Sequence, residues 1–491
     1  MDTTATAQGY KRVLSELKPQ RVFYHFENLC RIPHGSGNEE GVSKYCEAVA
    51  NANGLKNVRD ARNNVVIYCP ASKGYEKHPT VIIQGHLDMV CAKRPGSPVD
   101  MSKDPLKLKI YGDSIGAEDT SLGGDDGIAV AISLALIEDK EIPHPPLEIL
   151  LTTDEEVGMT GASALDGKLL SGRLLINLDS EEEGVFTVGC AGGLRVYTST
   201  EIKRTPFKGE YAELTISGLI GGHSGAEINK GRANSNVLMG KLLKEISAAT
   251  DIHLCRLEGG ERDNVITSHT AAAIMFEKRD CAAVIKAVSR FRSEFRKEFG
   301  NVESGGLIGI GLYGYKEELV LDTDSTRRTV SLLSSLPYGV HKMSPDVEGL
   351  VQTSSNVGVV KLDSDTVKVD CSVRSSVTVE RDELAYSIVK LAKSCGFAAE
   401  RVSPYPAWEY RKSSHLRDVM SEVYKKETGK EPEISVIHAG LECGLLSKKL
   451  PGLDAVSIGP DMRDIHSYSE RLDIASVGRT WKFVLDVLAA L

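Results

Sequence analysis

The chain has 491 residues, of which 41% are hydrophobic and 26% are charged, and its formal net charge is −9. This length predicts two or three domains, and the composition is that of a soluble globular protein. The acidic balance argues against nucleic acid as a partner, because phosphate binding favours a basic face. Small anionic or zwitterionic substrates stay compatible with it, since they need only one local cation.

The N-terminal stretch Met1–Ala5 does not resemble a signal peptide, which would begin with a basic segment and an apolar core. The longest apolar run, residues 128–137, is about half as long as a membrane span requires. The 10 cysteines are scattered and never form a Cys-x-x-Cys pair, a pattern typical of reduced thiols. We therefore expect a cytoplasmic protein with no membrane partner.

Hydrophobic patterning predicts the following elements in chain order. Helices are expected over residues 10–30 and 38–53, and Asn38 is a candidate N-cap for the second. Residues 93–113 are expected to form a surface loop with a short hairpin, and further helices are expected at 128–137 and 473–490. Short apolar runs predict buried strands at 64–69, 80–90, 147–151, 174–179 and 455–460.

Polar side chains of metal-ligand type follow several of these strands. Ligands in open α/β sheets sit outside the carboxyl ends of parallel strands, so a parallel sheet would gather these side chains at one rim. Histidines and carboxylates without cysteine are typical of a two-metal hydrolytic site. For the acids after residue 151 a solvated loop is the competing interpretation, and for a single aspartate before residue 128 it is a helix cap. The residues concerned are His86, Asp88, Asp125, Glu155, Glu156, Asp179 and His466.

The pattern changes between about residues 190 and 400, where alternating strands are interleaved with helices at 233–248, 281–299 and 381–394. Such alternation is typical of an antiparallel sheet with one solvated face. We therefore expect an α/β protein with a mixed, largely parallel sheet flanked by helices and an inserted α+β lid domain. The predicted boundaries are 1–190 and 400–491 for the catalytic domain and 191–399 for the insert.

Three residues of the insert are candidates for substrate contact. His223 lies among glycines, which allow close approach to a ligand but equally suit a tight turn with an exposed histidine. Asn264 lies in a polar turn, where a purely local role explains it as well. Arg374 lies on the polar side of its strand and could bind a substrate carboxylate through its guanidinium fork.

Six sequence blocks resemble, in order, the signature blocks of the dinuclear zinc metallopeptidases of the carnosinase and aminoacylase superfamily. They are GHLDMV at 85–90, GGDDG at 123–127, TTDEEVG at 152–158, NLDSEEEG at 177–184, GGHSG at 221–225 and HSYSE at 466–470. HAGLECG at 438–444 and the long insert resemble the aminoacylhistidine dipeptidase branch. The resemblance implies a zinc-exopeptidase-like catalytic domain, two zinc ions (or manganese or cobalt) per chain, and a homodimer.

The resemblance also implies roles for individual residues. His86 and Asp179 would bind one metal, Glu156 and His466 the other, and Asp125 would bridge the two. Asp88 would orient His86, and Glu155 would be the general base. His223 would stabilise the oxyanion, from its own chain or from the partner of a dimer, and require the lid to close. The substrate-binding residues implied are Arg374 for the carboxylate, Asn264 and His438.

The implied activity is metal-dependent hydrolysis of dipeptides, preferentially Xaa-His peptides such as carnosine or Gly-His. A tripeptidase, a carboxypeptidase or an N-acyl amino acid deacylase on the same scaffold is the alternative. A metal-binding or peptide-binding protein without hydrolysis is a third possibility, against which the base-type residue Glu155 argues. The chain departs from the usual blocks at Gly124, Asp126 and Tyr468. Because Asp126 adds a second carboxylate next to Asp125, the assignment of Asp125 as the residue that bridges the two metals is less definite.

Overall fold

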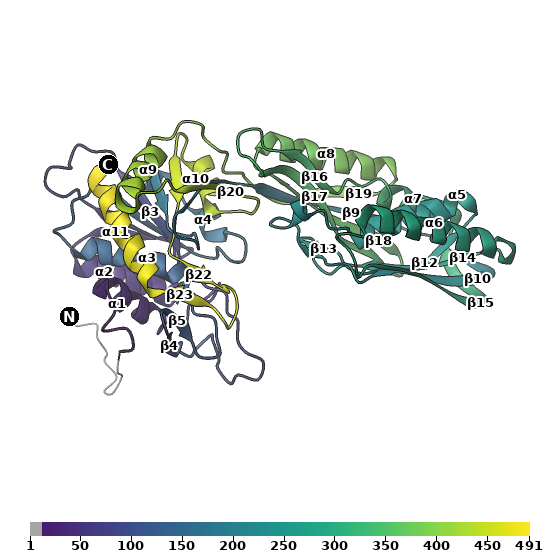
Figure 1. Cartoon of the computed structure of the whole chain (residues 1–491), viewed down its shortest axis with the longest axis horizontal. Helices are drawn as coiled ribbons and strands as arrows, with labels where there is room; N and C mark the ends of the chain where they lie inside the picture. Colours follow the sequence, from purple (N-terminus) through teal and green to yellow (C-terminus); the bar gives the residue numbers. More distant parts are fainter. Residues whose placement is uncertain (1–11) are drawn as a thin grey trace. The chain divides into compact units, whose positions relative to one another are not determined.

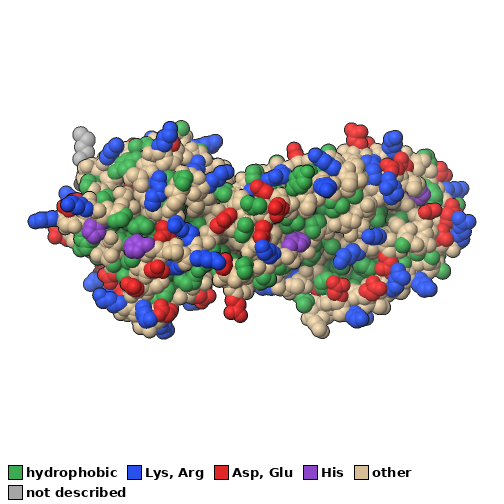
Figure 2. All heavy atoms as spheres, turned by 90° about the horizontal axis from the view of Figure 1, so that it is seen from above, with side chains coloured by type: hydrophobic (Ala, Val, Ile, Leu, Met, Phe, Trp, Pro, Cys, Tyr) green, Lys and Arg blue, Asp and Glu red, His purple; other side chains and the backbone are tan. Residues whose placement is uncertain are grey.

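The computed structural model describes residues 12–491, and they form two compact units. Unit 1 consists of the chain up to Val188 together with Tyr410–Ser435 and Leu445–Leu491, and unit 2 consists of Gly189–Glu409 and Val436–Gly444. Residues 400–409 and 436–444, which the sequence analysis assigned to the catalytic domain, thus belong to unit 2. Among the described residues, no helix has the length and apolarity needed to cross a membrane. On the face seen in Figure 2, acidic and basic side chains are interspersed.

Unit 1 is built on an eight-stranded mixed sheet. Its four central strands β6, β3, β7 and β21 run parallel, and antiparallel strands flank them. The central strands are buried along almost their whole length, as expected for a parallel sheet covered on both faces. In sheet order the strands are β1 (Lys56–Arg59), β2 (Val65–Cys69), β6 (Leu147–Thr152), β3 (Val81–His86), β7 (Leu174–Asn177), β21 (Asp454–Ser457), β8 (Val185–Cys190) and β20 (Glu433–Ile437).

Helices cover this sheet (Figure 1). α3 is apolar on all sides and buried from Gly124 to Ile137, because it packs against both α1 and β3. On the other flank, α9 packs against β21 and α11. The helices of unit 1 are α1 (Gln20–Leu29), α2 (Glu40–Ala52), α3 (Gly124–Glu138), α4 (Thr160–Ala164), α9 (His415–Thr428), α10 (Glu442–Lys449, shared with unit 2) and α11 (Ile474–Ala490), with a 3-10 turn at Gly167–Leu169.

Two N-terminal predictions are wrong in detail. The helix expected over 10–30 begins only at Gln20, because Pro19 lacks the N–H that a helix interior needs. Residues 10 and 11 of that prediction lie outside the described residues. Asn38 does not cap the next helix: Glu39 occupies the cap position, and the Asn38 side chain donates to Pro33 O and Ser102 O instead.

A small four-stranded sheet organises the C-terminal loop of unit 1. It contains the hairpin expected near residue 113, formed by β4 (Leu108–Tyr111) and β5 (Ser114–Ala117). This hairpin pairs with β23 (Arg471–Asp473), which in turn pairs with β22 (Met462–Arg463). The loop between β22 and β23 carries His466, so the small sheet fixes both ends of that loop.

Unit 2 is a nine-stranded antiparallel sheet whose helices lie on one face (Figure 1), which confirms the predicted α+β architecture. Aliphatic side chains of the strands and of α5–α8 form one core. The path order is β15 (Leu307–Leu321), β10 (Arg204–Ser217), β14 (Thr270–Phe276), β12 (His253–Gly259), β17 (Val351–Leu362), β18 (Thr366–Ser375), β9 (Gly192–Glu201) and β19 (Ala398–Tyr405), and β16 (Gly339–Met343) pairs with β17.

The remaining elements of unit 2 are helices and one short strand pair. The pair consists of β11 (Gly222–His223) and β13 (Val265–Ile266), and it brings the glycine-rich segment beside the polar turn at Asn264. The helices are α5 (Ser235–Ala249), α6 (Cys281–Phe299), α7 (Thr323–Leu333) and α8 (Thr378–Ser394), with 3-10 turns at Ile228–Lys230 and Lys278–Asp280.

Candidate active site

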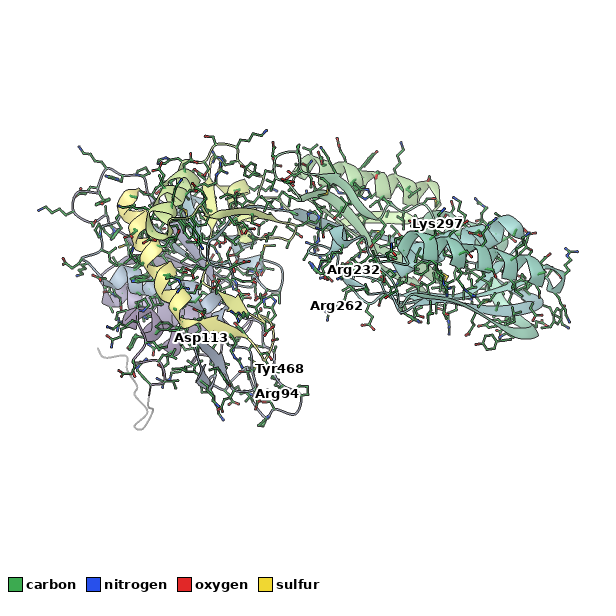
Figure 3. The ribbon with its side chains drawn as sticks, viewed as in Figure 1. Arg94, Asp113, Arg232, Arg262, Lys297 and Tyr468 are labelled. Carbon is green, nitrogen blue, oxygen red and sulfur yellow. The ribbon has the colours of Figure 1, made fainter. Side chains whose placement is uncertain are left out.

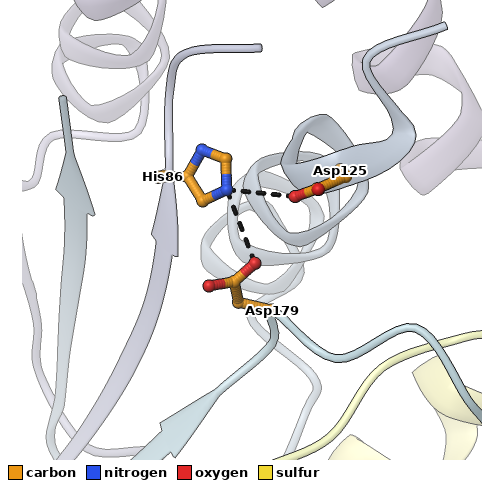
Figure 4. A group of neighbouring side chains, drawn as sticks. All are labelled: His86, Asp125 and Asp179. Carbon is orange, nitrogen blue, oxygen red and sulfur yellow. Dashed lines mark hydrogen bonds and ion pairs between the residues drawn. The ribbon is translucent and has the colours of Figure 1, made fainter. Parts of the chain in front are cut away.

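Two strand ends and one helix start bring the first group of ligand-type side chains together in unit 1. His86 ends β3, Asp179 follows β7, and Asp125 lies in the first turn of α3. His86 Nε2 is 3.1 Å from Asp125 Oδ1 and 3.4 Å from Asp179 Oδ1 (Figure 4). These three residues offer ligand atoms that all lie within 4.8 Å of one another, close enough to hold one metal ion.

A second group shares Asp125 with the first. His466 Nε2 lies 3.0 Å from Asp125 Oδ2 and 2.9 Å from Glu156 Oε1. Asp125 therefore directs one carboxylate oxygen to His86 and the other to His466. A carboxylate shared in this way can bridge two adjacent cations.

The charges in this cluster require compensation. Burial disfavours a charged His86, but the nearby carboxylates Asp179 and Asp125 raise its pKa well above the usual range. The adjacent carboxylates of Asp125 and Glu156 raise the pKa of His466 to about 10. Burial raises the pKa of Asp179 to about 6, although His86 opposes this shift. The carboxylates thus favour positive charge at both imidazole positions.

The donor set fits a pair of divalent cations. With neutral imidazoles, the carboxylates of Asp125, Glu156 and Asp179 would place three negative charges in a buried cluster, and unpaired buried charge is costly. Glu156 Oε1 is buried and accepts no hydrogen bond from residues 12–491, although His466 Nε2 lies nearby. Imidazole and carboxylate ligands suit zinc, manganese and cobalt.

Asp88 connects the ends of β3 and β6. Its backbone carbonyl lies 3.0 Å from His86 Nδ1, which leaves His86 Nε2 as the atom that faces the cluster. The Asp88 carboxylate accepts the N–H groups of Glu155 at 3.0 Å and Glu156 at 3.2 Å, and the hydroxyl of Ser36 at 2.7 Å. Asp88 therefore holds the backbone that presents both glutamates, in addition to its position beside His86.

Glu155 lies at the edge of the same cluster. It is half-buried, and its carboxylate falls within 4.8 Å of ligand atoms of His86 and Glu156. Its backbone follows β6 after a turn in which Asp154 has a positive φ of 55°. A carboxylate that is close to the metal-ligand atoms and partly solvated is well placed to exchange protons with water.

Two further acids near the cluster, Glu470 and Asp126, make contacts that the sequence did not predict. Glu470 is buried and accepts the backbone N–H groups of residues 122–125, so it fixes the turn that aims Asp125. Asp126, noted only as an extra charge, accepts the His86 N–H at 2.9 Å. Its carboxylate also occupies the space where a side chain at Gly85 would lie. The HSYSE block contains Glu470, but nothing local to it indicates a partner about 345 residues away in sequence.

At the edge of the loop that carries His466, Tyr468 contacts Arg94. The Arg94 guanidinium lies 5.0 Å from the centre of the Tyr468 ring, and the two side chains are neighbours in Figure 3. Arg94 also forms an ion pair with Asp119. The departure from the usual sequence block at Tyr468 thus forms a cation–π contact on the unit 1 surface.

Within unit 2 the other predicted residues lie near one another. The Ser224 N–H donates to Asn264 O at 2.9 Å, and the backbone of His438 approaches Gly225. Asn264 and Arg374 line the same small pocket. Arg374 influences the pKa of both His223 and His438, which places these three side chains within electrostatic range.

The hydrogen bonds of His223 define its tautomer. Its Nδ1 accepts the backbone N–H groups of Gly225 at 3.3 Å and Ala226 at 3.1 Å. The ring proton of the neutral form therefore resides on Nε2, which is left to donate. Burial, and after it the charge of Arg374, lowers the pKa of His223, so the neutral form prevails at neutral pH.

Arg374 presents a charged guanidinium, whereas His438 presents a neutral imidazole. Arg374 Nη1 donates to the Tyr405 hydroxyl at 2.9 Å, and its buried Nε–H has no hydrogen-bond partner in the described part of the chain. His438 Nε2 lies 2.7 Å from Ser354 Oγ. Burial, reinforced by Arg374, lowers the pKa of His438 to about 3, so this imidazole is neutral.

Comparison with known proteins identifies the family. Residues 82–490 match Peptidase family M20/M25/M40, and the chain belongs to this family. It is therefore a peptidase, as the sequence blocks predicted.

Individual relatives cover nearly the whole chain. The Cytosol non-specific dipeptidase of Escherichia coli (strain K12) is 36% identical over 478 residues, which are 97% of this chain and 98% of that protein. The crystal structure of the aminoacylhistidine dipeptidase from Vibrio alginolyticus is 34% identical, with a TM-score of 0.92 and 98% of each chain covered. An aminopeptidase structure from Bacillus cereus shares the fold at 16% identity, with a TM-score of 0.56 over 96% of this chain and 99% of that one.

Proposed function

We propose that this chain is a two-metal dipeptidase whose metals are held by His86, Asp125, Glu156, Asp179 and His466. The observation that carries the proposal is the position of Asp125. Its two carboxylate oxygens face two different histidines, and each histidine has a further carboxylate beside it. This arrangement provides two adjacent donor sets with one shared ligand.

We propose zinc as the native metal, with manganese or cobalt as the alternatives that the same ligands accept. When bound, such a pair of cations would polarise the scissile carbonyl and lower the pKa of an attacking water. The metal content of the purified protein, measured by plasma mass spectrometry, tests both identity and number. Two metal equivalents and loss of hydrolysis with a chelator are expected, and hydrolysis that is insensitive to chelation would contradict the proposal.

Glu155 is proposed as the general base. Its carboxylate would take a proton from the attacking water and pass it to the leaving amine, a role that requires contact with both solvent and the metal rim. The N–H bonds from Glu155 and Glu156 to Asp88 support this role, because they fix the turn that presents both carboxylates at the metal-ligand cluster. One glutamate can then bind metal while the other moves protons.

Unit 2 would supply the groups that recognise the peptide. His223 Nε2–H is proposed to donate to the oxyanion, since Nδ1 is already occupied by backbone N–H groups. Arg374 is proposed to bind the substrate carboxylate through its unpartnered Nε–H and the free edge of its guanidinium. Asn264 lines the same pocket as Arg374, and the neutral His438 could hydrogen-bond a substrate side chain.

The proposed substrates are dipeptides with a free carboxylate, and Xaa-His peptides such as carnosine and Gly-His are proposed as the preferred ones. The name of the Vibrio alginolyticus relative supports this preference, whereas the name of the Escherichia coli relative favours a broad range. A panel of Xaa-His, Xaa-Leu and Xaa-Gly dipeptides, tripeptides and N-acetyl amino acids tests the preference. Faster cleavage of tripeptides or N-acetyl amino acids would favour the alternative exopeptidase or deacylase activity.

We also propose a homodimer in the cytoplasm, with residues 191–399 forming most of a mobile lid. One observation supports the dimer and a second supports the location. The edge strand β15 exposes the large apolar side chains Leu307, Tyr313, Tyr315 and Leu319, a surface that a second copy could cover. The ten cysteines, which all lie within the described residues, form no disulfide with one another, as in a reducing compartment. Analytical ultracentrifugation tests the dimer.

A further inference from the structure

Unit 1 contains a cavity that shares no lining residue with the metal-ligand cluster. It has a volume of about 230 Å³ and lies between the loop before β8, the end of β21 and the helices α9 and α11. α9 and α11 lie side by side in Figure 1. The rim of the cavity includes the exposed side chains of Arg479 and Lys482, so the cavity is open to solvent and accessible to a ligand.

The wall of this cavity is aromatic. Phe186, Tyr424 and Phe483 contribute rings whose centroids lie 5.6 to 5.9 Å apart. The Tyr424 ring stands edge-on to Phe483 at 89° and to Phe186 at 73°, an arrangement that a further ring can join favourably. An apolar cavity of about 150 Å³ accommodates benzene, so 230 Å³ is room for a ring and a few polar atoms.

Groups of both charge signs stand at the mouth. Arg479 Nε and Nη2 contact the two carboxylate oxygens of Glu183 at 2.6 and 2.7 Å, and Lys482 pairs with Glu427. Both cations are more than half exposed and lie three residues apart on α11, so they project from the same side of the helix. Arg479 Nη1 makes no hydrogen bond within residues 12–491, which leaves a donor for a ligand carboxylate.

We infer that this cavity, here called the aromatic pocket, binds a free amino acid with an aromatic or large aliphatic side chain. The side chain would enter between Phe186, Tyr424 and Phe483. The ligand carboxylate would face Arg479 and Lys482, and its ammonium would face Glu183 or Glu427. A plain hydrocarbon would leave the charged mouth unused.

Hydrogen bonds donated by backbone N–H groups join the aromatic pocket to loops that continue from the metal-ligand residues. The Glu183 N–H donates to Asp461 Oδ1 at 2.8 Å, and the Met462 N–H donates to Glu181 O at 2.9 Å. A ligand bound in the pocket can therefore affect the position of the segment that follows Asp179 and of the segment that precedes His466. Amino acids are also the products of the proposed reaction. Only this connection between the pocket's ligand and the reaction products rests on the proposed function.

Binding of L-phenylalanine to the full-length, metal-loaded protein by isothermal titration calorimetry tests the inference. Arg479→Gln and Lys482→Met should each weaken binding by about tenfold or more, because each removes a charged contact at an exposed position that folding does not need. Lys425→Met is the matched control: Lys425 lies on α9 and forms an exposed ion pair with Glu431, but it does not line the pocket, so affinity should be unchanged.

The ligand's own groups provide the second arm of the test. Phenylpropionate, which lacks the ammonium, and phenethylamine, which lacks the carboxylate, should both bind at least about tenfold more weakly than L-phenylalanine. Equal binding of phenylpropionate would overturn the assignment of an amino acid and leave a monocarboxylate. Unchanged affinity in both pocket variants would place the ligand elsewhere, including at the metals, and would overturn the pocket itself. Neither result depends on whether the protein hydrolyses dipeptides.

Discussion

Glu470 provides the sharpest test of how this site is held together. Its Oε2 accepts N–H groups from Leu122 at 2.7 Å and Gly123 at 3.2 Å, and its Oε1 accepts from Gly124 at 2.8 Å and Asp125 at 3.4 Å. Glu470→Gln replaces one oxygen with an NH2 group that points at backbone donors. Whichever oxygen is replaced, the variant loses one short and one long hydrogen bond.

The magnitude follows from those contacts. A hydrogen bond to a charged group contributes about 1.5–3 kcal/mol, and a buried N–H left without a partner costs about 1–3 kcal/mol more. Burial raises the pKa of Glu470, so the cost of burying its charge offsets part of the gain. We expect the free energy of unfolding to fall by about 2–4 kcal/mol. Because the turn aims Asp125, metal affinity should also fall by roughly ten- to a hundredfold.

The assay combines urea unfolding in the presence of a chelator with a competition titration of zinc against a chromophoric chelator. Glu148→Gln is the matched control. Glu148 is a buried carboxylate of the same unit that accepts the Ser171 and Gly172 N–H groups, at the opposite end of β6 from Glu155. It should lose similar stability but keep wild-type metal affinity. If Glu470→Gln also kept wild-type metal affinity, the proposed positioning of Asp125 would be refuted.

Four other outcomes are expected. Glu155→Ala should retain two metals but lose kcat by roughly a thousandfold or more, because proton transfer is lost. Arg374→Met should raise KM for dipeptides while leaving dipeptide amides unaffected, because only the carboxylate contact is removed. If His223 acts across a dimer, mixing Glu155→Ala with His223→Ala subunits should restore about a quarter of wild-type activity, and otherwise none. His438→Asn should flatten the fall in unfolding free energy below pH 6.5.

The sign of the last effect follows from the pKa of His438, which is about 3 in the folded protein and ordinary in the unfolded chain. Between these values the unfolded state binds more protons, so stability rises with pH by up to about 1.4 kcal/mol per unit. Urea unfolding at pH 4.5, 5.5 and 7 measures this slope, and an equal slope in wild type and variant would contradict the assignment. For the other three, zinc content and circular dichroism confirm intact protein, and near-normal turnover of Glu155→Ala would show that another group is the base.

The sequence was most informative where a histidine or a carboxylate follows a buried strand. The run before Asp154 forms β6, and the runs before His86 and Asp179 form its parallel neighbours β3 and β7. Parallel pairing aligns their carboxyl ends, so three local signals specify one rim. Helix α1 was misjudged at its start, because the amphipathic pattern continued through Pro19 although proline prevents the helix from extending.

Residues that position the rim could not be predicted in the same way. Ser36 and Glu470 lie on loops and Asp126 lies in the first turn of α3, and each acts through backbone atoms or carboxylates of residues distant in sequence. A local pattern carries no record of such partners, since a buried glutamate and a solvated one look alike in sequence. The same holds for Tyr424 and Phe483, whose spacing suits any buried helix face and did not indicate a cavity.

There is a physical reason why ligand-type residues and the residues that position them differ in how well they can be predicted. The side chains at the strand ends must present charge to a ligand, so they stand at a rim and leave a buried excess of carboxylate. That excess repels itself, and the rim is stable only if other groups fix the backbone beneath it. Asp88 does so for the glutamates and Glu470 for Asp125, both by accepting N–H groups rather than by touching the ligand position. The type of chemistry can therefore be predicted from the residues at the strand ends. The exact positions of those residues depend on others, distant in sequence, that only the fold brings close to them.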